Sequence, residues 1–312
     1  MRALSEQFMA NLIKSDGLLF PILSRVKKDH TLMLAIRESN INIYYRGGNI
    51  LKLTEDKKGY KTFFDSNYSK LGKDTPTLPD AIEIQDDAEK CVISFPILKN
   101  FMDEYFSVHR KTEQEFQQLI ARMNNNSSIS NESEYFITDI EVTDSRDSGY
   151  RPRFDMMAIR WLAGNDRKTG EKCKAALIEM KYGDGALSGD AGLLKHLDDA
   201  HTLISNKEQY EKLLATMESQ FNQLDQLGLM NFKKGKSNAK VRLDVNIKPE
   251  VIFILADHNP RSQQLKKILT DPKIDEYEKL QLFDLRFFVA SFAGYGLHAK
   301  RMLSLAEFRK LL

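Results

Sequence analysis

The run Lys-Ala-Ala-Leu-Ile-Glu-Met-Lys-Tyr, at positions 174–182, constrains the fold of this chain most. Its first part is almost continuously apolar, which is typical of a strand covered on both faces in the middle of a sheet. Two charged residues, Glu179 and Lys181, interrupt its second part. Because side chains alternate along a strand, Glu179 and Lys181 are expected on one face and Met180 on the other. The run therefore predicts a buried central strand that carries charge near its end.

The surrounding patterns favour an α/β fold. Helices are expected over residues 86–124, with a break near Pro96, and over 192–227, 262–269 and 305–312. Strands are expected over 134–143, 153–161, 250–256 and 283–290. From about residue 100 the order is helix, three strands, helix, strand, helix, strand. This order predicts a mixed central sheet flanked by helices on both faces.

The first 85 residues show a different pattern. A helical pattern covers residues 1–30. Short strand-like runs follow at 31–37, 40–46, 49–54 and 60–64, and Gly47-Gly48 is typical of a hairpin turn. A chain of 312 residues is long enough for two domains. We therefore expect residues 1–85 to form N-terminal helices with an antiparallel α+β meander, and residues 86–312 to form the α/β domain.

The charge balance limits how the chain can bind a polyanion. Lys and Arg number 46 and Asp and Glu 44, so the net charge is only +2, and binding through bulk charge alone is excluded. The segment 231–248 is the exception, because it holds six basic residues against the single Asp244. It is either a phosphate-contacting loop or a solvated surface loop.

The cysteines and the hydropathy pattern indicate a cytoplasmic protein with no membrane partner. Cys91 and Cys173 are far apart and lack neighbouring ligands, so neither a disulfide framework nor a zinc knuckle is predicted. A reducing compartment suits them. The sequence has no apolar run of ~18 residues to span a membrane, and its first residues do not resemble a signal peptide.

A second charged residue interrupts the strand pattern at 153–161. Asp155 lies 24 residues before Glu179, a separation that suits two strands joined by a short connection. Asp155 and Glu179 would then face one another beside Lys181. Two carboxylates suit Mg²⁺ or Mn²⁺, and a lysine can assist deprotonation of water or neutralise charge on a phosphate. The alternative is a buried ion pair that only satisfies the sheet.

Asp155 followed by Glu179-Met180-Lys181 on consecutive strands resembles the PD-(D/E)XK, or restriction-endonuclease-like, nuclease superfamily. Phe154 stands where the family name has proline. The resemblance maps the family core onto residues 100–256. It implies a metal-dependent nuclease in which Asp155, Glu179 and the backbone carbonyl of Met180 bind Mg²⁺ or Mn²⁺. Lys181 would orient or activate the water. The implied substrate is nucleic acid, with DNA preferred to RNA.

The resemblance also suggests further site residues. Members often have another acid, and Glu141, inside an apolar strand, is a better candidate than Glu113 on a helix. Lys195, near the start of the helix after Glu-x-Lys, is a candidate nucleic-acid contact. His196 and His201 are five residues apart, a spacing that does not suit a two-histidine metal pair, and no histidine is assigned to catalysis.

Two alternatives remain open. The fold could serve as a non-catalytic module that binds nucleic acid or protein, although such a module usually loses one of the three site residues. Alternatively, residues 1–80 could act as an interaction module, with the remainder as scaffold. The sequence leaves the oligomeric state open, a homodimer included.

Overall fold

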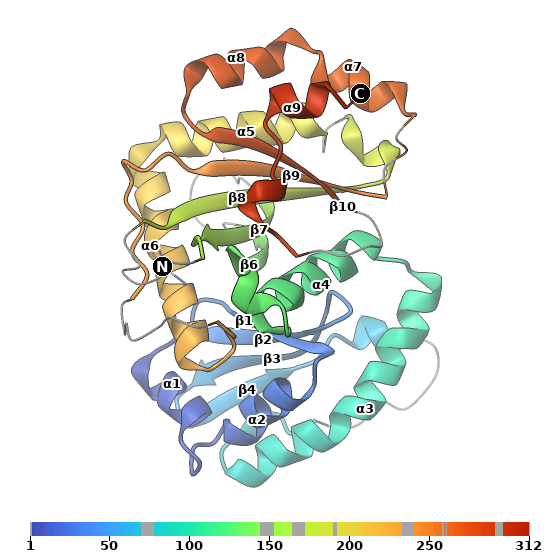
Figure 1. Cartoon of the computed structure of the whole chain (residues 1–312). Helices are drawn as coiled ribbons and strands as arrows, with labels where there is room; N and C mark the ends of the chain where they lie inside the picture. The colour runs from blue at the N-terminus through green and yellow to red at the C-terminus, as the bar shows by residue number, and fades with distance from the viewer. Residues whose placement is uncertain are drawn as a thin grey trace. The chain divides into compact units, whose positions relative to one another are not determined.

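A computed structural model gives the fold (Figure 1). It describes residues 2–69, 78–143, 153–163, 172–189, 192–232, 240–257, 259, 261–290 and 296–311; the side chains of residues 131, 141–143 and 153 lie outside the description. The chain forms two compact units. The first comprises residues 1–122 and 223–230, and the second comprises residues 123–222 and 231–312. The first unit thus extends beyond the expected boundary at residue 85.

The first unit is a five-stranded antiparallel meander with helices. Its elements are α1 (Glu6–Ile13), α2 (Phe20–Lys28), β1 (Leu32–Ile36), β2 (Asn40–Tyr45), β3 (Gly48–Asp56), β4 (Gly59–Phe63), β5 (Ala81–Ile82), α3 (Gln85–Val108) and α4 (Thr112–Asn126). The strand order is β1-β2-β3-β4-β5. The expected hairpin is present, and its turn is formed by Arg46 and Gly47, both with positive φ. Two such residues make the turn type that matches the twist of paired strands.

The second unit contains the mixed sheet. Its elements are β6 (Tyr135–Thr143), β7 (Arg153–Arg160), β8 (Lys174–Tyr182), α5 (Leu193–Ser205), α6 (Lys207–Gln226), β9 (Glu250–Ala256), α7 (Gln263–Leu269), α8 (Pro272–Leu280), β10 (Asp284–Ala290) and α9 (Leu305–Arg309). The strand order is β10-β9-β8-β7-β6. β6, β7 and β8 pair antiparallel, whereas β8, β9 and β10 pair parallel. The α/β class and the mixed sheet are therefore confirmed.

Strand β8 occupies the centre of this sheet, as its apolar run predicts. It pairs with β7 on one side and β9 on the other, and its seven inner residues are all buried. Both faces of β8 are therefore covered. In Figure 1 helix α5 runs beside the strands of this sheet, and α6 follows it. Phe221 of α6 packs edge-on against Phe136 and Trp161 and so joins the helix to the sheet core.

Several boundaries differ from those expected. The break in the 86–124 helix falls between α3 and α4, while Pro96 lies inside α3. A proline removes one helical hydrogen bond but is tolerated where packing along the rest of the helix compensates. The 192–227 helix divides at Asn206 into α5 and α6. Among the described residues no helix is long and apolar enough to cross a membrane.

Candidate metal and active site

The pairing of β7 with β8 brings Asp155 and Glu179 together. The last paired residues of this antiparallel ladder are Met156 and Ile178, so Asp155 stands opposite Glu179 at the next position. Opposed residues share a face of the sheet. Instead of a further ladder bond, Oδ2 of Asp155 accepts a hydrogen bond of 2.8 Å from the backbone N–H of Met180. This side-chain bond holds Asp155 at the point where the two strands stop pairing.

The Glu179 carboxylate is almost inaccessible, with 1% of its side chain exposed. Nζ of Lys181 lies 3.5 Å from its Oε2, and Nδ1 of His196 on α5 lies 3.2 Å from its Oε1. Neither oxygen has a hydrogen bond of acceptable geometry. A buried carboxylate without hydrogen bonds is costly, because it loses its hydration without replacement. Burying the Glu179 charge is therefore costly unless a proton, Lys181 or a ligand neutralises it.

Burial dominates the proton affinity of both acids. It raises the pKa of Asp155 to about 7, and the neighbouring charge of Glu179 adds to the rise, while Lys181 opposes it. Burial likewise raises the pKa of Glu179 to about 7, against the opposing effect of Lys181. Two interacting acids titrate as a pair. Near neutral pH the metal-free site therefore retains protons that a bound cation would displace.

Lys181 is the third charged residue of this site, beside Asp155 and Glu179. Its side chain is 5% exposed and lies on the same strand face as Glu179, two residues away. A lysine amine in this position carries three donors and a positive charge beside two acids. It can donate a hydrogen bond to an anionic oxygen or to a water held between itself and the carboxylates.

The oxygen atoms at this point fit a hard divalent cation. In a strand the N–H and C=O of one residue point to the same side, so the Met180 carbonyl points toward β7, as its N–H does. That carbonyl, the Glu179 oxygens and the second Asp155 oxygen are all hard ligands, which Mg²⁺ and Mn²⁺ prefer. Within the described residues no group of three or more His, Cys, Asp or Glu side chains is arranged for a metal. A cation here would therefore rely on two carboxylates, the carbonyl and water.

The remaining predicted acids are placed differently. Glu141 lies in β6 between Ile140, which pairs with Met156, and Val142, which pairs with Phe154, so its backbone stands opposite Asp155. Its side chain lies outside the described residues. Glu113 belongs to the first turn of α4, in the first unit, whereas the other candidates belong to the second.

The structure does not bring Lys195 to the carboxylates. Its side chain is 47% exposed and forms an ion pair with Asp199, one turn further along α5. In the basic segment, Lys233, Lys234 and Lys236 lie outside the described residues. Lys248 forms an ion pair of 3.0 Å with Asp284 instead of facing solvent alone.

His196 is a site residue that the sequence analysis missed. The five-residue separation between His196 and His201 tests only whether the two histidines could bind one metal ion together. The phase of α5 is the informative signal, because Leu193, Leu197 and Ala200 mark the buried face, and His196 lies three residues after the first and four before the last. A histidine on the buried face of a helix next to Glu-x-Lys points toward the sheet.

Family models, curated proteins and solved structures were compared with the chain, and none of them matches it.

Proposed function

We propose that the chain is a metal-dependent nuclease with a restriction-endonuclease-like core, which hydrolyses phosphodiester bonds in nucleic acid. Asp155, Glu179 and the carbonyl of Met180 would hold Mg²⁺ or Mn²⁺. Lys181 would act beside them. The observation that carries the proposal is the buried Glu179 carboxylate, which stands opposite Asp155 with Lys181 at 3.5 Å and has no hydrogen bond of normal geometry.

The fold supports the same proposal. The second unit has three antiparallel strands, a helical segment, and a further strand that pairs parallel to β8. This is the order expected for a restriction-endonuclease-like core. The acids lie on β7 and β8, the two strands on which the resemblance places them.

Each residue has a distinct role in the proposed reaction. Burial favours the protonated forms of Asp155 and Glu179, and a cation that displaces those protons would meet two negative charges. Lys181 holds the attacking water by a hydrogen bond and offsets the charge that develops on the phosphate oxygens. When bound, the divalent cation would supply the Lewis acid that polarises the phosphate and lowers the pKa of water.

DNA is the preferred substrate on resemblance alone. The test is a cleavage assay with single-stranded, double-stranded and branched DNA and with RNA, in Mg²⁺ or Mn²⁺ and in EDTA. We expect cleavage of at least one substrate that requires the cation. Lys181→Ala is the active-site variant, and Lys212→Ala, on an exposed part of α6, is its control. Equal cleavage by the two variants would assign the activity to a contaminant, and a wild type that cuts nothing would favour a binding module.

A further inference from the structure

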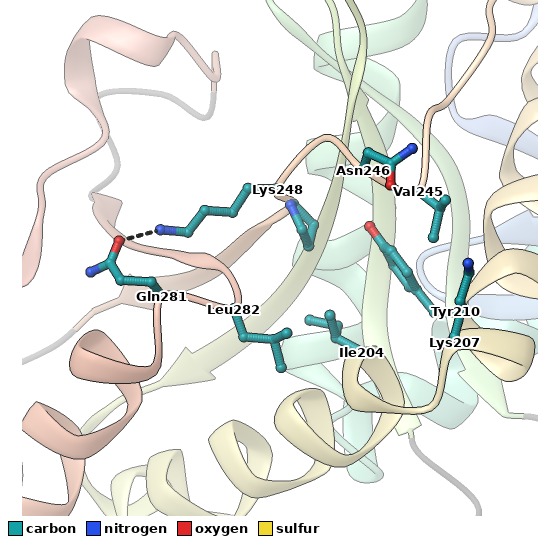
Figure 2. A pocket seen from close by; sticks show the side chains of 9 residues that line it. Ile204, Lys207, Tyr210, Val245, Asn246, Lys248, Gln281 and Leu282 are labelled. Carbon is teal, nitrogen blue, oxygen red and sulfur yellow. Dashed lines mark hydrogen bonds between the residues drawn. The ribbon is translucent and has the colours of Figure 1, made fainter.

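A cavity of the same unit shares no lining residue with the carboxylate site. It has a volume of about 350 Å³ and is lined by the end of α5, the start of α6, the segment before β9 and the connection from α8 to β10 (Figure 2). Pro249 lines it directly before β9 begins, whereas Glu179 pairs with Phe253, further along that strand. Ligand cavities typically start at about 300 Å³, so this cavity could hold a small molecule.

Tyr210 provides a buried polar side chain in the wall of this cavity. The residue is only 3% exposed, and Figure 2 shows its hydroxyl pointing toward the side of the cavity formed by Asn246. In the described part of the chain its hydroxyl has no hydrogen-bond partner. Burial raises the pKa of Tyr210 above its usual range, so the group keeps its proton at neutral pH. An unpaired hydroxyl that opens into the cavity can donate a hydrogen bond to a ligand there.

The charges around the cavity favour an anionic ligand. Lys207 and Lys248 line it, and none of the other described lining residues is acidic. Lys207 opens α6, where the helix dipole adds positive potential, and its nearest acid, Glu211, is 3.9 Å away. Lys248 does have a partner, Asp284, but Asp284 is shared with Lys174 at 3.2 Å. The cationic groups therefore outnumber the acids that neutralise them.

The rest of the lining is apolar. Ile204, Val245, Pro249 and Leu282 contribute hydrocarbon surface. Figure 2 shows the side chains of Ile204 and Leu282 next to one another, on the side of the cavity away from Asn246. A ligand that satisfies both parts of the lining must carry a flat or compact apolar body and one anionic group.

We propose that this cavity binds a small organic anion, composed of an apolar body about the size of one ring and a single phosphate or carboxylate group. The anionic group accepts a hydrogen bond from Tyr210 and lies near Lys207. The apolar body rests on Ile204 and Leu282. This binding site is independent of the proposed nuclease site, because it shares no residue with it.

The test uses four probes with the full chain in EDTA, measured by calorimetry or ligand-observed NMR. The probes are phenyl phosphate, benzoate, inorganic phosphate and benzyl alcohol. We expect a Kd of about 1 mM for phenyl phosphate or benzoate, which is ordinary for ligands of this size. Inorganic phosphate and benzyl alcohol each lack one half of the required chemistry and should bind much more weakly. The stronger of the two aromatic anions identifies the anionic group.

Matched variants locate the binding. Lys207→Ala and Tyr210→Phe should each weaken it about 3- to 10-fold, the effect of losing one hydrogen bond or one partly exposed charge. Lys212→Ala removes a similar lysine of α6, paired with Glu208 outside the cavity lining, and should leave binding unchanged. Equal affinities in all three variants would overturn the proposal. Binding that survives Lys207→Ala but is lost in Lys181→Ala would do so as well, by placing the anion at the carboxylates.

Discussion

Two buried carboxylates lie near opposite ends of the strands of the same sheet, and their surroundings differ. Glu250 opens β9 and is 3% exposed; its Oε2 accepts a hydrogen bond of 2.6 Å from the Tyr135 hydroxyl, and its Oε1 lies 3.1 Å from Arg160. Glu179 is buried to the same degree, but neither of its oxygens is hydrogen-bonded. Burial alone therefore does not distinguish a functional acid from a structural one.

The difference lies in what the neighbouring strands offer. Tyr135 and Arg160 are paired on adjacent strands, and both reach Glu250. The neighbours of Glu179 are a second acid, a lysine at 3.5 Å and a histidine at 3.2 Å. A satisfied buried carboxylate stabilises the fold, whereas a cluster of acids with too few donors stores unfavourable energy that a ligand can relieve.

The largest expected effect concerns activity. Lys181→Ala removes the group proposed to hold the water and to offset charge on the phosphate, so cleavage should fall about 10²- to 10³-fold, as when one preorganised donor is lost. Glu250→Gln, at the satisfied cluster, should change the rate per folded molecule little. Single-turnover cleavage of the best substrate measures both. A rate loss in Glu250→Gln comparable to that in Lys181→Ala would remove the distinction between the two acids.

The second effect concerns stability, and here the variant of Glu250 should lose more than the variant of the proposed site. Glu250→Gln leaves the half-buried Arg160 without a charged partner and should lower the free energy of unfolding by about 1.5–3 kcal/mol, the range for losing a hydrogen bond to a charged group. Glu179→Gln relieves repulsion with Asp155, and Asp155 remains as a charged neighbour of Lys181, so its cost should be below about 1 kcal/mol. Urea denaturation in EDTA compares the two variants directly. A larger loss in Glu179→Gln would make Glu179 a structural counter-ion of Lys181.

The third effect is the response to metal. Millimolar Mn²⁺ should raise the melting temperature of the wild type, because a cation that binds only the folded state stabilises it. Asp155→Asn should abolish that rise, since an amide is a poor ligand for a hard cation. Lys181→Ala keeps both carboxylates and should keep the rise. Stabilisation of Asp155→Asn equal to that of the wild type would place the cation elsewhere.

The smallest effect is on pH dependence. The pKa values of Asp155 and Glu179 are raised to about 7 from 3.8 and 4.5, so folding favours their protonated forms. The stability that this contributes is complete below the unfolded values and is lost as pH rises through 7. In EDTA the melting temperature should therefore fall from about pH 5 to pH 7 and level off above about pH 8. The slope should flatten in Asp155→Asn and persist in Glu250→Gln, and an unchanged slope in Asp155→Asn would refute the assignment.

Much of the second unit could be predicted from sequence because its strands are strongly patterned. The apolar runs that became β8 and β9 are buried at every inner position, and such runs have few other stable locations. Asp155 and Glu179 could be paired because both interrupt apolar strands. Because side chains alternate between the two faces of a strand, pairing the strands antiparallel then places both acids on the same face of the sheet.

Other features have weaker local signals or depend on contacts that local patterns do not encode. The division between α5 and α6 has no proline or glycine, and its local signal is Asn206, whose Oδ1 accepts a hydrogen bond from the backbone N–H of Gln209 as an N-cap does. Lys195 and His196 are adjacent on α5, yet only His196 faces Glu179, because a helix turns by about 100° per residue. Choosing between them requires knowing which face of α5 packs against the sheet. The positive charge of Lys195 favours a nucleic-acid contact but gives no information about that face.

The early end of the β7–β8 ladder has a consequence for how this chain tolerates changes in length. Asp155 and Glu179 meet only because Met156 pairs with Ile178, and a one-residue slip would turn one acid to the other face. The length of the connection between residues 163 and 172 does not enter that alignment. Insertions and deletions should therefore accumulate in the connection, whereas a single deletion inside either strand should separate the two acids while leaving a folded sheet.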